Sequence, residues 1–408
     1  MRLDIAGGFY REICSSPAWN EFYGSGARAA AALQNFDVER HLHTAVSQKA
    51  LPWLRGLADA YDFQITHTEV PATISFRYFH PLSPPLITPP IHALRERPKL
   101  SVTGDCVLRY GMLDAEAIVD GDRVVYDPQS AFEPSRFEEN GSTAKELAVV
   151  ANFSEARKLT GKTDLADIGE KLSSDGAAVV VVKNGAYGAT VFSKGSASKI
   201  PAYKTKRVFS IGSGDVFSAV FAYNWGVQRQ SAPDAAAAAS VATSFYTENG
   251  FLPLPPRSTG AEFPVIEAKP RRVSAAHVPP WDIYIAGPFF NLKQLWLIEE
   301  LKRIFEDFNL NVFSPFHDVG RGAAANVATL DLEALEQSDL VFACVDELDA
   351  GTIFEIGYAR SHKIPVIGFC ESTGKNDLKM LEGSGCVLIN DFVTAIYTAM
   401  WQLLEAKT

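Results

Sequence analysis

A glycine-rich turn followed at once by a carboxylate lies near the middle of the chain. Residues 209–217 read Phe-Ser-Ile-Gly-Ser-Gly-Asp-Val-Phe, and small apolar residues follow. Backbone N–H groups at such a helix start can face an anion, and the helix dipole favours negative charge there. An acid beside that anion can take the proton of an attacking hydroxyl. The turn is therefore either a plain helix cap, the commoner case for such a pattern alone, or an anion hole at Gly212, Ser213 and Gly214 with Asp215 as the base.

A second carboxylate follows a strand-like run in the last third of the chain. Residues 349–359 read Asp-Ala-Gly-Thr-Ile-Phe-Glu-Ile-Gly-Tyr-Ala, after the apolar run Val341–Val345. We expect Glu355 in or near the first turn of a helix, where the dipole keeps a carboxylate ionised and therefore nucleophilic. Upstream, residues 283–290 read Ile-Tyr-Ile-Ala-Gly-Pro-Phe-Phe, a buried strand entering a glycine turn. A ligand can approach the backbone at such a strand end.

Four segments, in order along the chain, make residues 1–255 resemble the ribokinase (PfkB) family of sugar and nucleoside kinases. Besides residues 212–215, they include Asn-Phe-Ser-Glu at 152–155 and Lys-Asn-Gly at 183–185. The resemblance implies use of ATP and Mg²⁺, with no residue assigned as a direct metal ligand. It assigns nucleotide and magnesium handling to Asn152, Glu155, Lys183, Gly185 and Gly188. It assigns sugar binding to Gly8, Glu12, Gly24, Gly26 and Arg28.

Two positions depart from the kinase pattern. The family's aspartate at the start of the anion-hole motif is Phe209 here, which removes a carboxylate that helps to order the loop. The asparagine usual after the glycine-rich sugar segment is Arg28. Because a guanidinium offers only hydrogen-bond donors, Arg28 suggests an acceptor with an anionic or otherwise unusual group. The alternative is that Arg28 pairs with a surface carboxylate.

Residues 281–400 resemble the nucleoside 2-deoxyribosyltransferase family, through the long 349–359 motif and Ala-Gly-Pro-Phe-Phe upstream. The resemblance implies that Glu355 attacks the anomeric carbon of a nucleoside, as the nucleophile of a retaining glycosidase does. It also implies a site completed by a neighbouring subunit, and hence a homo-oligomer, at least a dimer. The nucleoside-binding residues implied are Gly287, Pro288, Phe289, Asp331, Asp349, Gly351, Thr352 and Asn390.

The carboxylates at this second site bear on the substrate. A carboxylate at Asp349 is unfavourable beside a phosphate, because like charges repel. We therefore expect an unphosphorylated nucleoside rather than a nucleotide. The sequence leaves open which base and pentose bind, and whether a second base or water accepts the sugar.

Strand-like apolar runs alternate with helical patterns along most of the chain, which predicts α/β units with parallel sheets. The resemblances imply a ribokinase-like three-layer α/β/α domain at 1–255 and a flavodoxin-like (Rossmann-like) parallel-sheet domain at 281–408. Between them, residues 256–280 are rich in proline and predict an extended linker. A second proline-rich patch, residues 81–98, indicates a surface loop or lid.

Length and charge agree with two units. The 408 residues exceed the size at which one core usually stops growing. The net charge of −10 disfavours nucleic acid as a partner. From Trp281 onward there are 9 Lys and Arg against 19 Asp and Glu, so all of the net charge lies in the last third. Five scattered cysteines, no signal-like N-terminus and no membrane-length apolar run indicate a cytoplasmic protein that binds no membrane.

The two units are parts of one chain, which suggests that their sites act in one pathway of nucleoside or sugar metabolism. The leading hypothesis is a bifunctional enzyme: the C-terminal domain cleaves or exchanges a base, and the N-terminal domain phosphorylates a sugar or nucleoside with ATP. One alternative is a degenerate kinase domain that senses a nucleoside or nucleotide and regulates the C-terminal enzyme. A 5′-monophosphate N-glycosidase fed by the kinase, and a C-terminal sensor for an active kinase, are further alternatives.

Overall fold

The computed structural model describes residues 1–94, 97–130, 132–255, 264–266, 280–320, 322–374 and 376–406. The chain divides into two compact units, Met1–Ile266 and Glu267–Thr408. Most of the predicted linker, residues 256–280, lies outside the described residues. Residues 264–266 pair with the first unit, since the backbone N–H of Lys204 donates to the carbonyl of Pro264 at 2.8 Å.

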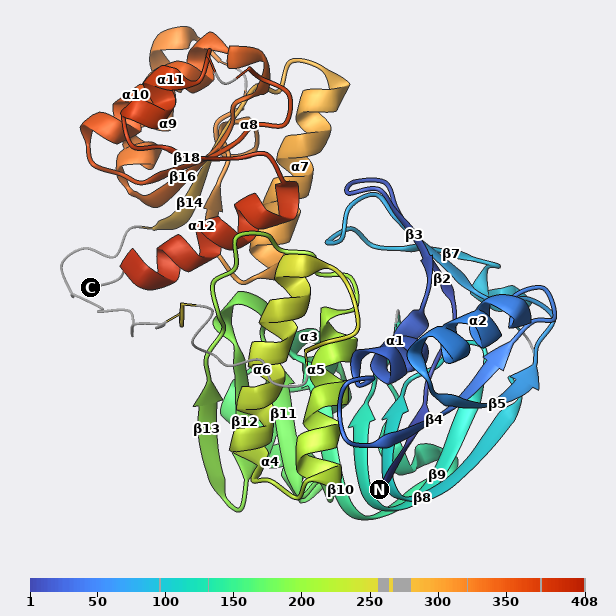
Figure 1. Ribbon diagram of the computed structural model, residues 1–408. Coiled ribbons are helices and arrows are strands. Elements are labelled where there is room, and N and C mark those ends of the chain that lie inside the picture. Colours follow the sequence, from blue (N-terminus) through green and yellow to red (C-terminus); the bar gives the residue numbers. More distant parts are fainter. Residues whose placement is uncertain are drawn as a thin grey trace. The chain divides into compact units, whose positions relative to one another are not determined.

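The first unit is built on a nine-stranded sheet (Figure 1). Neighbouring strands in this sheet run parallel, except that β12 runs antiparallel to β11 and β13. In spatial order the strands are β13 (Ser196–Ile200), β12 (Ala189–Ser193), β11 (Val179–Lys183), β10 (Thr143–Asn152), β9 (Glu116–Asp127), β8 (Lys99–Tyr110), β1 (Arg2–Ala6), β4 (Glu39–Val46) and β5 (Gln64–Glu69).

Helices cover both faces of this sheet, and the reason can be read from β11. Its valines alternate between two cores: Val179 and Val181 pack on one face, Val180 and Val182 on the other. A strand buried on both faces needs a continuous apolar run. The first face carries α1 (Gly24–Ala32), α2 (Leu51–Tyr61), α5 (Ser213–Phe221) and α6 (Ala232–Asn249), and the second carries α3 (Phe153–Thr160) and α4 (Leu165–Ser174).

A small four-stranded sheet accompanies the large one. Its strands are β3 (Trp19–Phe22), β2 (Arg11–Cys14), β6 (Ser75–Tyr78) and β7 (Leu86–Thr88). The prediction of a loop over residues 81–98 is wrong at β7, because residues 86–88 pair with β6 and become an edge strand.

The second unit contains a five-stranded parallel sheet in the order β15 (Val312–Phe313), β14 (Trp281–Ala286), β16 (Ser338–Cys344), β17 (Val366–Phe369) and β18 (Val387–Ile389). Numbered along the chain this order is 2-1-3-4-5, the flavodoxin-like arrangement, in which ligands bind where the order reverses. Here the reversal lies between β14 and β16. The predicted fold class is confirmed in both units.

Helices also cover both faces of the second sheet. Alternate residues of β16 face opposite layers of helices. Val341 and Ala343 pack with residues of the helices Ala324–Glu336 and Ala350–Ser361. Phe342 packs edge-on against Phe305 of the helix Leu292–Asp307, with 5.3 Å between the ring centroids. The helices are α7 (Leu292–Asp307), α8 (Pro315–Asp318), α9 (Ala324–Glu336), α10 (Ala350–Ser361), α11 (Lys379–Gly383) and α12 (Phe392–Ala406).

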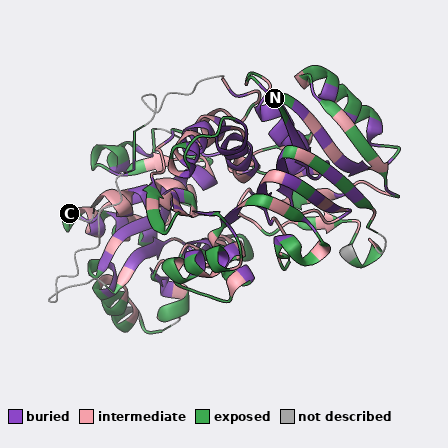
Figure 2. Cartoon of the chain, turned by 90° about the horizontal axis from the view of Figure 1, so that it is seen from below, coloured by how far each residue is buried: buried purple, intermediate pink, exposed green. Residues whose placement is uncertain are grey.

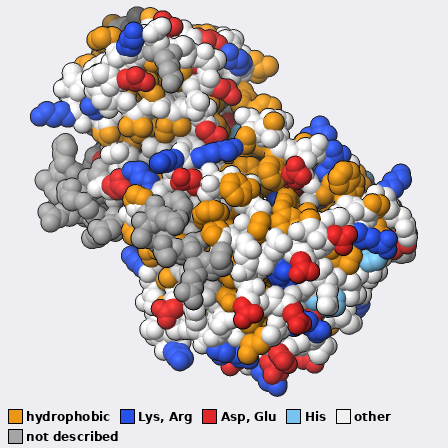
Figure 3. Space-filling model, in the orientation of Figure 1, with side chains coloured by type: hydrophobic (Ala, Val, Ile, Leu, Met, Phe, Trp, Pro, Cys, Tyr) orange, Lys and Arg blue, Asp and Glu red, His pale blue; other side chains and the backbone are white. Residues whose placement is uncertain are grey.

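Burial follows these layers. The strands of both sheets are largely buried, and the outward helix faces are exposed (Figure 2). Acidic and basic side chains lie interspersed on the face of the first unit that Figure 3 displays. All five cysteines are buried and free. Among the described residues, we find no helix with the length and apolar character that a membrane crossing requires.

Candidate active sites of the two units

A cavity of about 380 Å³ lies in the first unit, and the predicted anion-hole loop forms part of its wall. Helix α5 begins at Ser213, directly after Gly212. Gly212 has a φ of 78°, a left-handed conformation that favours glycine. The N–H of Ser213 donates to the carbonyl of Ser210 at 3.1 Å, whereas the next N–H groups of the first turn have no partner within the helix and can face an anion. Six predicted residues line the cavity: Gly8, Glu12, Glu155, Gly212, Gly214 and Asp215.

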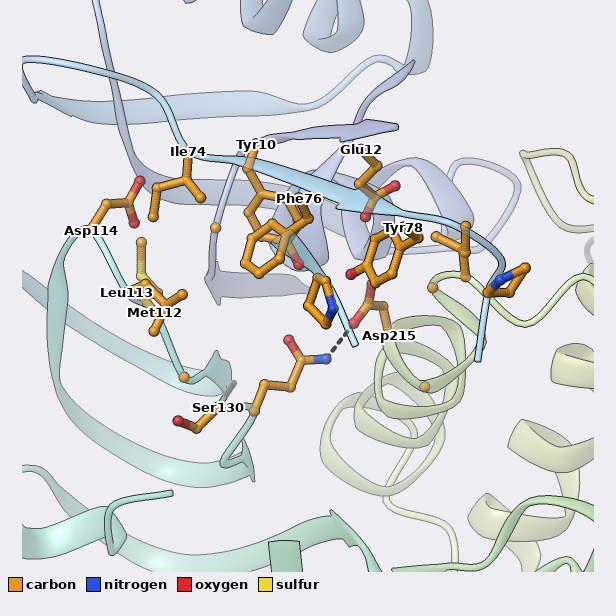
Figure 4. Close-up of a pocket in the computed structure, with 18 of the residues that line it drawn as sticks. Tyr10, Glu12, Ile74, Phe76, Tyr78, Met112, Leu113, Asp114, Ser130 and Asp215 are labelled. Atoms are coloured by element: carbon orange, nitrogen blue, oxygen red, sulfur yellow. Dashed lines mark hydrogen bonds between the residues drawn. The ribbon is translucent and has the colours of Figure 1, made fainter. Parts of the chain in front are cut away.

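The carboxylate of Asp215 is bound on both oxygens. Arg28 donates from Nη1 to Oδ2 at 2.8 Å, and Gln129 donates from Nε2 to Oδ1 through a short hydrogen bond (Figure 4). The side chain of Asp215 is also almost fully buried. A base needs a free lone pair directed at the proton it accepts. The two oxygens of Asp215 offer about four lone-pair positions, so these two bonds fix the side chain and leave positions at which a proton can be accepted.

Arg28 lies beneath the anion-hole loop. Its side chain is 1% exposed, and its two terminal nitrogens both donate to Glu12, Nη1 to Oε1 at 2.9 Å. A Cβ on Gly212 would lie 2.1 Å from Nε of Arg28, so only glycine allows this packing. The terminal nitrogens of Arg28, which we expected to face an anionic acceptor, instead donate to carboxylates of the chain that are buried rather than on the surface, and Nε has no hydrogen-bond partner.

A second ion pair supports the same region. Lys183 donates from Nζ to Asp127 at 2.8 Å, and the hydroxyl of Ser218 donates to the same oxygen at 2.6 Å. Asp127 is fully buried, and burial raises its pKa while Lys183 opposes the rise. A Cβ on Gly214 would lie 3.5 Å from Nζ of Lys183, so the cation lies directly below the loop.

Asn152 and Glu155 form a capping box at the start of α3. The backbone N–H of Glu155 donates to Asn152 Oδ1 at 2.8 Å, and the N–H of Asn152 donates to Glu155 Oε2 at 2.9 Å. Glu155 also lines the cavity. Burial, and then the charge of Asp127, raises the pKa of Glu155 to about 7. A carboxylate placed there fits a hydrated cation beside phosphate.

Several other predicted residues do not line the cavity and instead shape the backbone of the first unit. Gly24 begins α1 with a φ of 70°, and a Cβ there would lie 2.5 Å from the carbonyl oxygen of Gly8. The N–H of Gly26 donates to that same carbonyl at 3.0 Å. Gly185 and Gly188 shape the turn between β11 and β12.

Residues missed by the sequence prediction complete the cavity. Tyr10, Phe76 and Tyr78 form an aromatic wall, with 4.6 Å between the ring centroids of Tyr10 and Phe76. In Figure 4 the rings of Tyr10 and Phe76 lie between Asp114 and Asp215, and the ring of Tyr78 lies beside Asp215. Asp114 is 4% exposed, its Oδ2 has no hydrogen-bond partner, and burial raises its pKa to about 6. Asp114 and Gln129 each follow the end of a long strand, a signal that could have identified them.

In the second unit, Glu355 meets a tyrosine that the sequence prediction did not assign. The hydroxyl of Tyr284, on β14, donates to Glu355 Oε1 at 2.7 Å. Tyr284 is completely buried, and Glu355 is half-buried on α10, which follows β16. The pair therefore lies at the reversal between β14 and β16.

Glu355 is the sixth residue of α10, near the first turn as predicted but just beyond it, so the helix dipole acts on the carboxylate only weakly. Burial raises its pKa to about 7. The bond from Tyr284 lowers the pKa, whereas the charges of Asp331 and Asp349 raise it further.

Asp349 caps α10. Its Oδ2 accepts the backbone N–H of Thr352 at 2.9 Å and the Thr352 hydroxyl at 3.1 Å. A Cβ on Gly351 would lie 3.1 Å from this oxygen. Asp331, on α9, has an unpartnered Oδ1, and burial raises its pKa to about 6. Both acids are close enough to influence the pKa of Glu355.

The loop after β14 and the end of β18 hold the remaining predicted residues. Gly287 packs against Cys344, and Pro288 is buried. The ring of Phe289 lies 5.5 Å from that of Phe316. Asn390 is exposed just after β18, the strand at the other edge of the sheet from β15.

Two family profiles match the chain. Residues 121–250 match the pfkB family carbohydrate kinase, and residues 283–390 match the nucleoside 2-deoxyribosyltransferase. Among curated proteins, none matches this chain.

Solved structures of ribokinase-family proteins are similar to about three fifths of the chain. A pyrophosphate-dependent kinase in the ribokinase family, complexed with a pyrophosphate analog and myo-inositol, has 16% identity and a TM-score of 0.44, with 64% of this chain and 99% of that chain covered. The Methanocaldococcus jannaschii nucleoside kinase has 13% identity and a TM-score of 0.46, with 61% and 92% covered. Fructokinase from Vibrio cholerae O395 has 14% identity and a TM-score of 0.45, with 61% and 93% covered.

Proposed function

We propose that this chain, which joins a PfkB-type region to a nucleoside 2-deoxyribosyltransferase-type region, cleaves the N-glycosidic bond of an unphosphorylated nucleoside at Glu355. The observation that carries the proposal is the 2.7 Å hydrogen bond from Tyr284 to Glu355 where the strand order reverses. The bond holds one carboxylate oxygen in place and leaves the other to attack.

The chemistry proceeds in two balanced steps. The ionised carboxylate of Glu355 attacks the anomeric carbon, and the base leaves with the electron pair of the glycosidic bond. A proton must reach the departing base, and Asp331 suits the role of proton donor. Its pKa of about 6 means that more of it is protonated near neutral pH than of an ordinary aspartate. A second base or water then attacks the same carbon and restores the Glu355 carboxylate.

The charge around Glu355 supports a neutral substrate. Asp331 and Asp349 both raise its pKa, which means that the site already holds repelling carboxylates. A 5′-phosphate would add a further anion. We therefore favour nucleosides, and the test is a nucleoside panel with the corresponding 5′-monophosphates, in which free base is followed by chromatography. Faster base release from the monophosphates would contradict this preference.

The pH dependence of base release is a direct prediction. Because Glu355 must be ionised and Asp331 protonated, kcat/KM should follow a bell-shaped pH profile with its maximum between about pH 6 and 7. Tyr284→Phe removes a bond that stabilises the ionised form of Glu355, so the maximum should move to higher pH. Tyr358→Phe, on the same helix but bonded to Glu336, is the matched control. Superimposed profiles for Tyr284→Phe and wild type would contradict the assignment.

For the first unit we propose binding of a nucleoside or nucleotide in the cavity to regulate the second unit. This choice rests on Asp215, whose two oxygens are held by Arg28 and Gln129. ATP-dependent phosphorylation is the second candidate, favoured by the glycine loop at the start of α5 and by Glu155 in the cavity wall.

Phosphate fits that loop, since Gly212 and Gly214 line the cavity at the start of α5 and Lys183 lies close to Gly214. ATP would supply the transferable phosphoryl group and Mg²⁺ would shield its charge. One assay with Mg-ATP and a nucleoside panel distinguishes regulation from ATP-dependent phosphorylation. Regulation predicts ligand-dependent base release without ADP, whereas ADP formation that Asp215→Asn abolishes would establish the kinase.

The aromatic wall and Asp114 predict the kind of ligand. A purine or pyrimidine ring fits between aromatic side chains, and the unpartnered oxygen of Asp114 can accept an N–H from an amino group on the base. Asp114→Asn should weaken binding of adenosine or cytidine roughly tenfold to a hundredfold, measured by calorimetry. Binding to wild type should also weaken as the pH falls through about 6, where Asp114 becomes protonated.

Asp120→Asn, at an exposed position on β9, is the control for that substitution. Equal affinities of wild type and Asp114→Asn for both nucleosides would contradict the role of Asp114.

A further inference from the structure

Two neighbouring central strands of the first unit bring together two imidazoles and a carboxylate. Asp4 lies on β1, and His41 and His43 lie on β4, where Asp4 pairs with His41 and Ala6 with His43. One ligand atom from each of Asp4, His41 and His43 lies within 4.8 Å of the others. None of the three lines the cavity described above.

The oxygen that faces the imidazoles is Oδ1 of Asp4. It is hydrogen-bonded to Nε2 of His43 at 3.0 Å and lies 3.6 Å from Nδ1 of His41. Ligand atoms that share a metal ion at about 2.0–2.2 Å are themselves roughly 3–3.5 Å apart. Both separations from Asp4 are therefore close to those around a common ion, which would replace the hydrogen bond between Asp4 and His43.

Outer contacts orient the ligand atoms of Asp4 and His41 inward. Arg2 donates from Nε to the other carboxylate oxygen of Asp4 at 2.9 Å, which leaves Oδ1 facing the imidazoles. Nε2 of His41 lies 2.8 Å from the hydroxyl of Thr66 on β5. When the other nitrogen of an imidazole is held in this way, the free nitrogen presents its lone pair to a metal. Nδ1 of His41 is that nitrogen, buried and without a hydrogen-bond partner.

The cluster is enclosed but open enough for an ion to enter. The Asp4 side chain is 2% exposed, and those of His41 and His43 are 17% and 14% exposed. On the side of β8, a Cβ on Gly104 would lie 2.6 Å from Oδ2 of Asp4, so the backbone closes that side. Three protein ligands leave at least one coordination position for water.

We propose that Asp4, His41 and His43 bind a borderline divalent transition-metal ion of the Zn²⁺ class. Two imidazole nitrogens and one carboxylate oxygen suit Zn²⁺, Co²⁺, Ni²⁺ or Fe²⁺, whereas Mg²⁺ and Ca²⁺ prefer oxygen ligands alone. The ion links β1 to β4 in the middle of the sheet and is separate from any magnesium that accompanies a nucleotide.

The test uses the full chain, freed of metal with a chelator and titrated with Co²⁺ and Zn²⁺ at pH 7.5. Wild type should bind one equivalent of each, with a visible ligand-field spectrum for Co²⁺ and no thiolate charge-transfer band. His43→Gln and His41→Gln should lose at least tenfold in affinity. His67→Gln, an exposed histidine on β5, should bind like wild type.

Two outcomes would overturn the proposal: no stoichiometric uptake by wild type, or uptake that His41→Gln and His43→Gln leave unchanged. Asp4→Asn provides a further variant, in which the side chain keeps the shape of aspartate but loses its negative charge. Because wild type alone can fail the titration, the test does not depend on whether the variants fold.

Discussion

Replacing Glu355 with Gln should lower base release from a nucleoside by roughly a thousandfold or more, because the amide cannot form the covalent bond to the anomeric carbon. The substitution keeps the shape of the side chain, so Tyr284 retains a hydrogen-bond acceptor at the same place. Binding of the nucleoside should change little. The measurement is single-turnover release of free base, with mass spectrometry of wild type for a glycosylated Glu355.

The matched control is Glu333→Gln, an exposed position on α9. It should release base at the wild-type rate. If Glu355→Gln also keeps that rate, Glu355 is not the nucleophile and the proposed function of the second unit fails. Loss of binding together with loss of rate would instead place Glu355 in substrate recognition.

Replacing Arg28 with Met should destabilise the first unit by about 3–5 kcal/mol, because it leaves the buried carboxylates of Glu12 and Asp215 without their shared cation. The expected result is a lower midpoint in urea unfolding of the full chain, followed through the transition that belongs to the first unit. Arg11→Met should change this midpoint little, since Arg11 makes an exposed hydrogen bond to Asn20.

A double replacement separates charge from packing. Arg28→Met combined with Glu12→Met removes the cation and one of its carboxylates together, and should cost less than Arg28→Met alone. An equal or larger cost for the double variant would mean that Arg28 stabilises the loop through packing. In that case the restraint on Asp215 loses its electrostatic basis.

The ion triad also bears on whether the first unit transfers phosphate. Family members with asparagine at the position of Arg28 have no guanidinium to hold the base, according to the resemblance described above. Arg28→Asn together with Glu12→Gln should therefore free one oxygen of Asp215. Appearance of ADP formation in this variant, and its absence in wild type, would support restraint of the base by Arg28.

Much of the fold could be read from the sequence. The valine run of β11 predicts a strand buried on both faces, and the structure places its residues in two cores. The glycines at 212 and 214 predict a helix start that can approach an anion, and α5 begins at Ser213. Local patterns of this kind succeed because glycine and apolar periodicity report the backbone conformation directly.

The environment of Glu355 depends on more than its place in a helix. Asp349 caps α10 through Thr352, so Glu355 falls in the second turn, close to the predicted position. Burial, which the local sequence does not report, raises the pKa of Glu355 to about 7.

By itself, the sequence determined the α/β class and the residues able to do chemistry, Asp215 and Glu355 among them. Only the tertiary structure decided which partners these carboxylates have. Arg28 lies 187 residues from Asp215, and Tyr284 lies 71 residues from Glu355. Pairing and burial determine whether a carboxylate is restrained or poised to react, and both depend on side chains that only folding brings together.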